Sequence, residues 1–107
     1  MSKKVLGLDL SLTSTGYVLL EQGEIIEKEC IKSKPSGEYP IDELRRILAI
    51  VAEIEEISAK HEIALVVIEN LAFGVKNATS LTQLSGLNYF IRKLFFDNKI
   101  PFVLVLS

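Results

Sequence analysis

The chain has 107 residues, of which 49% are hydrophobic and 24% charged, and its formal net charge is −2. This length fits a single compact domain over residues 1–107. The charge balance is not the strongly basic one of a typical nucleic-acid binder, so a nucleic-acid function must rest on a local basic patch or on a metal. No apolar stretch approaches the ~20 residues of a membrane-spanning helix. Cys30 is the only cysteine, which excludes an internal disulfide, fits a reducing cytoplasm and predicts a buried, inert thiol.

The first third of the chain predicts a three-stranded meander. The expected strands run from Lys4 to Leu10, from Gly16 to Glu21 and from Glu24 to Lys32. Gln22 and Gly23 form a hairpin turn between the second and third strands. The polar turn from Ser11 to Thr15 is also short, so the first two strands are expected to be antiparallel neighbours.

An amphipathic helix is predicted from Ile41 to Lys60. Apolar residues recur there at spacings of three and four, and these are Leu44, Ile47, Val51, Ile54 and Ile57. Asp42 and Glu43 lie in the first turn, where they complement the positive end of the helix dipole. His61 follows the helix and is expected to act as an end cap, not as a metal ligand.

The second half of the chain alternates strands and a helix. Ala64 to Glu69 is an apolar run typical of a central strand covered on both faces. A loop from Leu71 to Ala78 leads to a helix that starts with a capping box at Ser80 and ends at Asn98. Ile100 to Leu106 predicts a last, buried strand.

This order predicts an α/β domain with a mixed five-stranded sheet, in which three antiparallel strands precede the parallel ones and helices cover the sheet. The last strand is followed only by Ser107. A core strand usually continues into a helix that covers it, so we expect the domain to have further C-terminal helices beyond this chain.

Asp9 and Glu69 are the candidate catalytic residues. Each is an acidic residue at the end of an apolar run, and burying a carboxylate is costly unless it is paired or binds a cation. If the two strands are neighbours, both carboxylates reach the same end of the sheet and form an oxygen-rich site suited to Mg²⁺ or Mn²⁺. Two alternatives remain open, namely that Asp9 accepts backbone N–H bonds in its turn and that Glu69 pairs with a lysine.

The hydroxyl-rich turn after Asp9 also has two interpretations. Ser11, Thr13, Ser14 and Thr15 could bind a phosphate, or they could only shape the hairpin. The pattern alone does not separate these alternatives.

Two segments resemble the motifs of RuvC-type Holliday junction resolvases. The segment from Gly7 to Tyr17 is similar to the first motif, in which an Asp ends the first strand and a Gly-Tyr pair opens the second. The segment from Ile68 to Ser80 resembles the second motif, in which a catalytic Glu precedes a loop with an aromatic residue and a Lys-Asn pair. The similarity extends over nearly the whole chain.

The resemblance implies a ribonuclease-H-like fold and a Mg²⁺-dependent endonuclease that cuts branched DNA during recombination and repair. It implies a homodimer and makes Asp9 and Glu69 metal ligands. Phe73 corresponds to the loop aromatic that stacks on an unpaired base, and Lys76 and Asn77 are expected to contact phosphate. The residues themselves also allow two alternatives to these roles. Phe73 could pack onto the core instead of stacking on a base, and Lys76 could be a solvated loop residue.

The family also supplies two further aspartates from a helix after the last strand, and Asp97 is not a candidate for them because it lies near the end of the preceding helix. Two other functions therefore stay open. One is a catalytically incomplete module for DNA binding or assembly. The other is part of an actin-like or sugar-kinase ATPase, although those proteins favour glycine within the first turn, and Leu10, Ser11 and Leu12 offer none.

Overall fold

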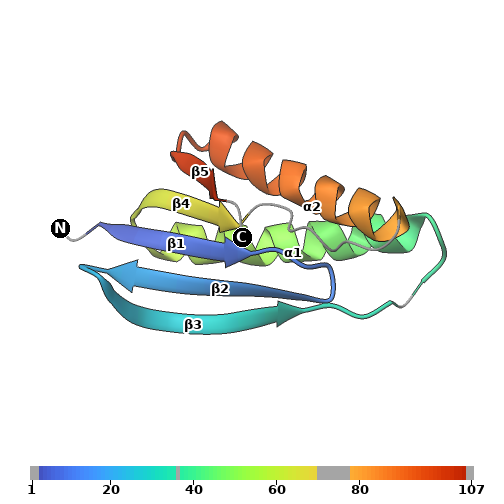
Figure 1. The fold of residues 1–107 in the computed structure, drawn as a ribbon, viewed down its shortest axis with the longest axis horizontal. Helices are drawn as coiled ribbons and strands as arrows, with labels where there is room; N and C mark the ends of the chain where they lie inside the picture. The colour runs from blue at the N-terminus through green and yellow to red at the C-terminus, as the bar shows by residue number, and fades with distance from the viewer. Residues whose placement is uncertain (1–2, 36, 70–77, 106–107) are drawn as a thin grey trace.

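The computed structural model of the protein describes residues 3–35, 37–69 and 78–105, and seven helices and strands lie within these ranges. Three strands come first, and a helix, a strand, a helix and a strand follow (Figure 1). The strands are β1 (Lys4–Asp9), β2 (Ser14–Glu21), β3 (Glu24–Lys32), β4 (Ile63–Glu69) and β5 (Phe102–Val105), and the helices are α1 (Ile41–Lys60) and α2 (Ala78–Asp97). This is the predicted order.

The five strands form one mixed sheet in the order β3-β2-β1-β4-β5. β1 and β3 both pair antiparallel with β2, whereas β4 pairs parallel with β1 and with β5. Each parallel connection passes through a helix, as parallel strands require. The predicted α/β class and the three antiparallel strands followed by parallel strands are confirmed.

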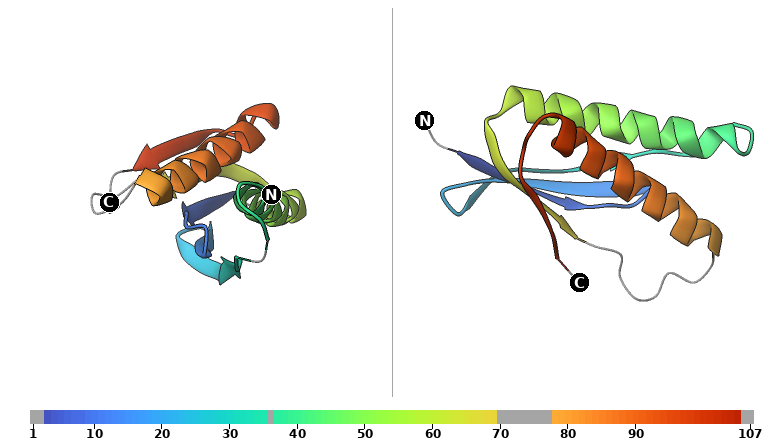
Figure 2. Two further views of the ribbon diagram at one scale, coloured as in Figure 1. Left: turned by 90° about the vertical axis from the view of Figure 1, so that its right-hand side faces the viewer. Right: turned by 90° about the horizontal axis from the view of Figure 1, so that it is seen from above.

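Both helices lie along the same face of the sheet (Figure 2). Successive strand residues point to opposite faces, and one set of alternate residues is buried with the helices in a single hydrophobic core. The strands contribute Leu6, Leu8, Tyr17, Leu19, Ile31, Val66 and Ile68, and the helices contribute Ile47, Ile50, Ile54, Leu87, Ile91 and Phe95. In the described part of the chain the opposite face has no helix over it, and we call it the open face.

The open face corrects the prediction of strands buried on both sides. In β4 the residues that point away from the helices are only half-buried. β5 lies at the edge of the sheet, so Val103, Leu104 and Val105 are exposed there. The expected core strand from Ile100 to Leu106 is thus, within its described residues, an exposed edge strand from Phe102 to Val105.

The helices follow the sequence closely, with two differences. α1 has the predicted bounds, but its buried side is rotated, so that Ile50 is 1% exposed while Leu44 is 42% exposed. α2 begins at Ala78, before the expected capping residue Ser80. Within the described ranges, neither helix combines the length and apolar character needed to cross a membrane.

Candidate active site

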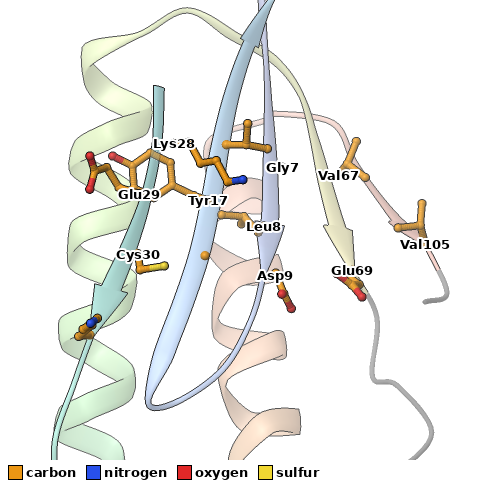
Figure 3. A pocket seen from close by; sticks show the side chains of 13 residues that line it. Gly7, Leu8, Asp9, Tyr17, Lys28, Glu29, Cys30, Val67, Glu69 and Val105 are labelled. Atoms are coloured by element: carbon orange, nitrogen blue, oxygen red, sulfur yellow. The ribbon is translucent and has the colours of Figure 1, made fainter. Parts of the chain in front are cut away.

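Asp9 and Glu69 end two neighbouring parallel strands. Asp9 is the last residue of β1, Glu69 is the last residue of β4, and the two are paired in the sheet register. Neighbouring strands lie about 4.8 Å apart, and paired residues point to the same face. Both carboxylates therefore project side by side on the open face, at the carboxyl-terminal ends of the two parallel strands (Figure 3).

Neither carboxylate is buried as the sequence predicted. Asp9 is exposed and Glu69 is half-buried, because no described element covers this side of the sheet. Neither side chain forms a hydrogen bond or an ion pair with another described residue. Within the described chain, the alternatives of a turn acceptor for Asp9 and a lysine partner for Glu69 are thus not observed.

The turn after Asp9 uses its hydroxyl groups to hold its own shape. The Thr15 hydroxyl is fully buried and donates to the Ser11 carbonyl at 2.6 Å, while the Ser11 amide donates to the same hydroxyl at 3.2 Å. The Ser14 amide donates to the Ser11 hydroxyl at 3.3 Å. These bonds support the hairpin-shaping interpretation, and Thr13 is the exposed hydroxyl of the group.

Arg46 of α1 ties this turn to the end of β3. Its Nε donates to the Ser33 hydroxyl at 3.0 Å, and its Nη2 approaches the Leu12 carbonyl at 3.5 Å. The Ser33 hydroxyl in turn donates to that carbonyl. The connection between β1 and β2 is therefore fixed from the helix side of the sheet, three residues beyond Asp9.

A groove of about 840 Å³ runs across the open face beside the two carboxylates (Figure 3). Gly7 and Gly16 line it, so the groove reaches the backbone of β1 and β2. At Gly7 a Cβ atom would lie 2.9 Å from Cγ1 of Val18, closer than carbon atoms tolerate. Gly7 is therefore required by the close approach of the Val18 side chain.

The far side of the groove is formed by β3, which contributes Lys28, Glu29, Cys30 and Lys32. Sequence reasoning assigned no role to the two lysines, although the alternation of β3 already places them on one face. The expected buried thiol is wrong, because Cys30 is exposed. Its position on the edge strand and on the open face explains the difference.

Tyr17 lies beneath the groove on the helix side and has a perturbed pKa. Burial, together with the hydrogen bond that its hydroxyl donates to Glu27, raises the pKa of Tyr17 to about 12. The negative charges of Glu27, Glu29 and Glu53 act in the same direction. Tyr17 thus stays protonated at neutral pH and serves the core.

The donor set at the strand ends fits a hard divalent cation. Two carboxylates with no cationic partner among the described residues offer oxygen ligands, which Mg²⁺ and Mn²⁺ prefer. Within residues 3–35, 37–69 and 78–105, no group of three or more His, Cys, Asp or Glu side chains is arranged to hold a metal. Asp9 and Glu69 therefore form a two-ligand site, and Mg²⁺ needs further oxygen ligands from water or substrate.

Three further predicted site residues, Phe73, Lys76 and Asn77, lie outside the described residues. Their expected contacts with an unpaired base and with phosphate stay predictions.

Comparison with known proteins gives similarity in structure without similarity in sequence. No family model and no curated protein matches the chain. The structure of Thermus thermophilus RuvC in complex with a Holliday junction substrate matches with a TM-score of 0.83 and 16% identity, over 98% of this chain and 65% of that one. The yeast mitochondrial Holliday junction resolvase Ydc2 matches with a TM-score of 0.66 and 16% identity, over 98% and 50%.

More distant structures share the same core. A ROK hexokinase from Thermus thermophilus matches with a TM-score of 0.52 and 20% identity, over 96% of this chain and 33% of that one. The chain thus spans between one third and two thirds of the length of these proteins. The ribonuclease-H-like fold implied by the sequence resemblance is confirmed, with RuvC-type resolvases among its structural neighbours.

Proposed function

We propose that this protein is a Mg²⁺-dependent endonuclease that cleaves phosphodiester bonds in branched DNA such as Holliday junctions. The observation that carries the proposal is the paired register of Asp9 and Glu69, which places side by side on the open face two carboxylates without a partner among the described residues. The fold supports it, because solved Holliday junction resolvases share this architecture. The same fold in a hexokinase means that the site, not the fold, decides between these functions.

The chemistry assigned to the site is hydrolysis. Water adds to the phosphorus atom of the scissile phosphodiester, one ester P–O bond breaks, and the departing oxygen takes a proton. A divalent ion, when bound, lowers the pKa of water and stabilises the charge on the phosphate and the leaving oxygen. Asp9 and Glu69 would hold that ion through their carboxylate oxygens, and Mn²⁺ would substitute for Mg²⁺.

The rest of the proposed interface follows the sequence resemblance. Phe73 stacks on an unpaired base near the branch point, and Lys76 and Asn77 contact phosphate. Ser11 and Thr13 lie in the turn beside the carboxylates and approach the same strand, although the Ser11 hydroxyl already accepts a bond from Ser14. We further propose a cytoplasmic homodimer that acts in recombination and repair, and the lone cysteine fits that compartment.

Cleavage of a synthetic four-way junction tests this function. With Mg²⁺ or Mn²⁺, the wild-type protein is expected to cut the junction in preference to a linear duplex of the same sequence. Asp9→Asn and Glu69→Gln each lower the rate by at least about 100-fold, equivalent to about 2.7 kcal/mol. Asp97→Asn and Glu55→Gln are matched controls on the helices, and both retain the wild-type rate.

Two outcomes contradict parts of the proposal. If the Glu69→Gln variant still cleaves junctions at the wild-type rate, the assignment of the active site is wrong. A protein that binds junctions but never cuts them, with Asp9→Asn binding equally well, is instead a module for DNA binding or assembly. That alternative is favoured by one observation, namely the two-carboxylate donor set among the described residues.

A further inference from the structure

The lysines and the glutamates in the second half of β3 lie on opposite faces of the sheet. Ile31 of β3 is 5% exposed and belongs to the core, so residues of the same parity face the helices. Glu27 and Glu29 share that parity, and Glu27 accepts the hydrogen bond from Tyr17. Lys28 and Lys32 have the opposite parity and line the groove on the open face. Figure 3 shows Lys28 among the residues that line it. The side chains of this half of β3 on the open face are therefore two lysines and Cys30, although Glu29, which has the opposite parity, also lines the groove.

These two lysines have no anionic partner in the described chain. The described ion pairs involve Lys4, Arg46, Lys60 and Lys93. Lys28 and Lys32 are exposed, and their ammonium groups form no hydrogen bond with another described residue. One wall of the groove therefore carries two ammonium groups, and its other end carries two carboxylates, all four without a charged partner among residues 3–35, 37–69 and 78–105.

The sheet register fixes how these charges lie relative to one another. One row across the open face runs from Cys30 through Gly16 and Asp9 to Glu69. Cys30 is two strand spacings, or about 10 Å, from Asp9, and Lys28 and Lys32 lie on either side of that row. Because Gly16 stands between them without a side chain, nothing in the row separates the lysine wall from the carboxylates.

We propose that Lys28 and Lys32 bind a backbone phosphate of the DNA strand whose neighbouring phosphodiester lies at Asp9 and Glu69. This inference rests on the proposed function. A phosphodiester at the carboxylates belongs to a polyanion, and its strand continues along the groove in the direction that carries compensating charge. The two lysines thus orient the strand and offset the repulsion between DNA and a protein of net charge −2.

Salt dependence of binding is the direct test. Binding of a fluorescent four-way junction is measured by anisotropy with Ca²⁺ in place of Mg²⁺, over a series of NaCl concentrations. Each lysine contact with phosphate contributes about 0.9 to the slope of log K against log[salt]. The double variant Lys28→Ala with Lys32→Ala is therefore expected to reduce the slope by between about 1 and 2, equally for junctions of different sequence.

The matched control removes the same charge elsewhere. Lys60→Ala with Lys93→Ala takes two lysines from helix positions that are paired with Glu56 and Asp97, and it retains the wild-type slope. A wild-type slope in the β3 double variant overturns the proposal, as does an equal loss in both variants. Absence of DNA binding by the wild-type protein also overturns it.

Cys30 provides a second readout that needs no loss of charge. It is the only cysteine of the chain, it is exposed, and it lies between the two lysines on the same face. Saturating junction DNA is expected to slow its alkylation by a maleimide at least about tenfold, and the β3 double variant is expected to lose most of this protection. Equal alkylation rates with and without saturating DNA contradict the proposal.

The inference and the proposed function fail in different ways. If junction binding depends on Lys28 and Lys32 but no cleavage occurs, the phosphate contact is supported and the nuclease function is contradicted. If the junction is cleaved but the β3 double variant has the wild-type salt slope, the nuclease function is supported and the phosphate contact is contradicted. Lysine-dependent binding of ATP or inorganic polyphosphate that is tighter than binding of DNA overturns both, and assigns the groove to a small phosphorylated ligand.

Discussion

At the scale of single residues, Gly7 and Gly16 keep the groove open beside the two carboxylates. Gly7 pairs with Val18 and Gly16 pairs with Asp9 across β1 and β2. The two glycines differ in the room around them, because a Cβ at Gly7 would lie 2.9 Å from the Val18 side chain, whereas at Gly16 its nearest neighbour would be 3.9 Å away. This difference gives a matched pair of substitutions.

Gly7→Ala is expected to lower the free energy of unfolding by about 1–3 kcal/mol, because Val18 must move. Gly16→Ala, with ordinary contacts, is expected to keep at least the wild-type stability. Urea unfolding followed by circular dichroism measures both. Adding Val18→Ala to Gly7→Ala removes the clash, so the double variant should be more stable than the two single effects predict. Equal effects of the two glycine substitutions contradict this account.

The candidate residues could be predicted from the sequence only in part. Asp9 and Glu69 stand out because each is a lone charge after an apolar run. Lys28 and Lys32 do not stand out, since β3 alternates lysine and glutamate and only the buried Ile31 shows which parity faces the solvent. Cys30 was misassigned for the same reason, because its residue type favours burial while its parity and edge position expose it.

At the scale of elements, α1 both covers the sheet and fixes the turn next to the site through Arg46. Arg46→Ala removes two hydrogen bonds from a guanidinium group, so we expect a loss of about 1.5–3 kcal/mol in the free energy of unfolding. The amides of Ser14 and Thr15 should also exchange their hydrogens faster than in the wild type. Arg45→Ala, at the exposed neighbouring position, is the control and should leave both quantities unchanged.

Unchanged exchange at Ser14 and Thr15 in the Arg46→Ala protein, despite lower global stability, contradicts the anchoring role. In that case Arg46 stabilises α1 through Asp42, its partner four residues earlier, and not the turn.

The elements themselves were predictable where their periodicity is strong. The bounds of α1 agree with its pattern, and the first three strands agree within two residues. The incorrect predictions concern the burial of the elements, which depends on the parts of the molecule that cover them. An apolar run predicts a strand equally well in the core and at an edge, so β5 was expected to be buried although it lies outermost.

At the scale of the whole molecule, α2 leaves an apolar stripe uncovered on the outer surface. Leu81, Tyr89 and Phe96 share one side of the helix by their spacing, and Tyr89 and Phe96 are 65% and 75% exposed. The guanidinium of Arg92 lies 4.6 Å from the centroid of the Tyr89 ring. Large exposed aromatic groups of this kind are typical of protein interfaces, and they support the proposed homodimer.

Substitution of this stripe tests the dimer. The double variant Tyr89→Glu with Phe96→Glu is expected to sediment as a monomer, because it places charges inside an apolar interface. The wild type and the control Lys60→Glu, at an exposed position of α1, are expected to sediment as dimers. A wild-type protein that is monomeric at all concentrations, or a double variant that remains dimeric, contradicts this assignment of the interface.

The arrangement of the whole molecule places the proposed metal ligands and the lysines that we propose to bind phosphate on the same open face of the sheet. The parallel register brings Asp9 beside Glu69, and the antiparallel pairing of β2 brings the lysines of β3 to the same groove. The helices fill the other face, so the core is separate from the site. A fold of this kind explains why two carboxylates 60 residues apart in sequence meet without any local motif that joins them.

The most direct test of the central claim is whether Asp9 and Glu69 bind one divalent ion together. Mn²⁺ is titrated into ¹⁵N-labelled protein, and paramagnetic broadening of the amide signals is followed. We predict that broadening starts at Asp9, Gly16 and Glu69, spares the opposite strand ends at Lys4, Glu21 and Ile63, and disappears in Asp9→Asn. Broadening centred on other acidic residues, or broadening unchanged in Asp9→Asn, contradicts the account.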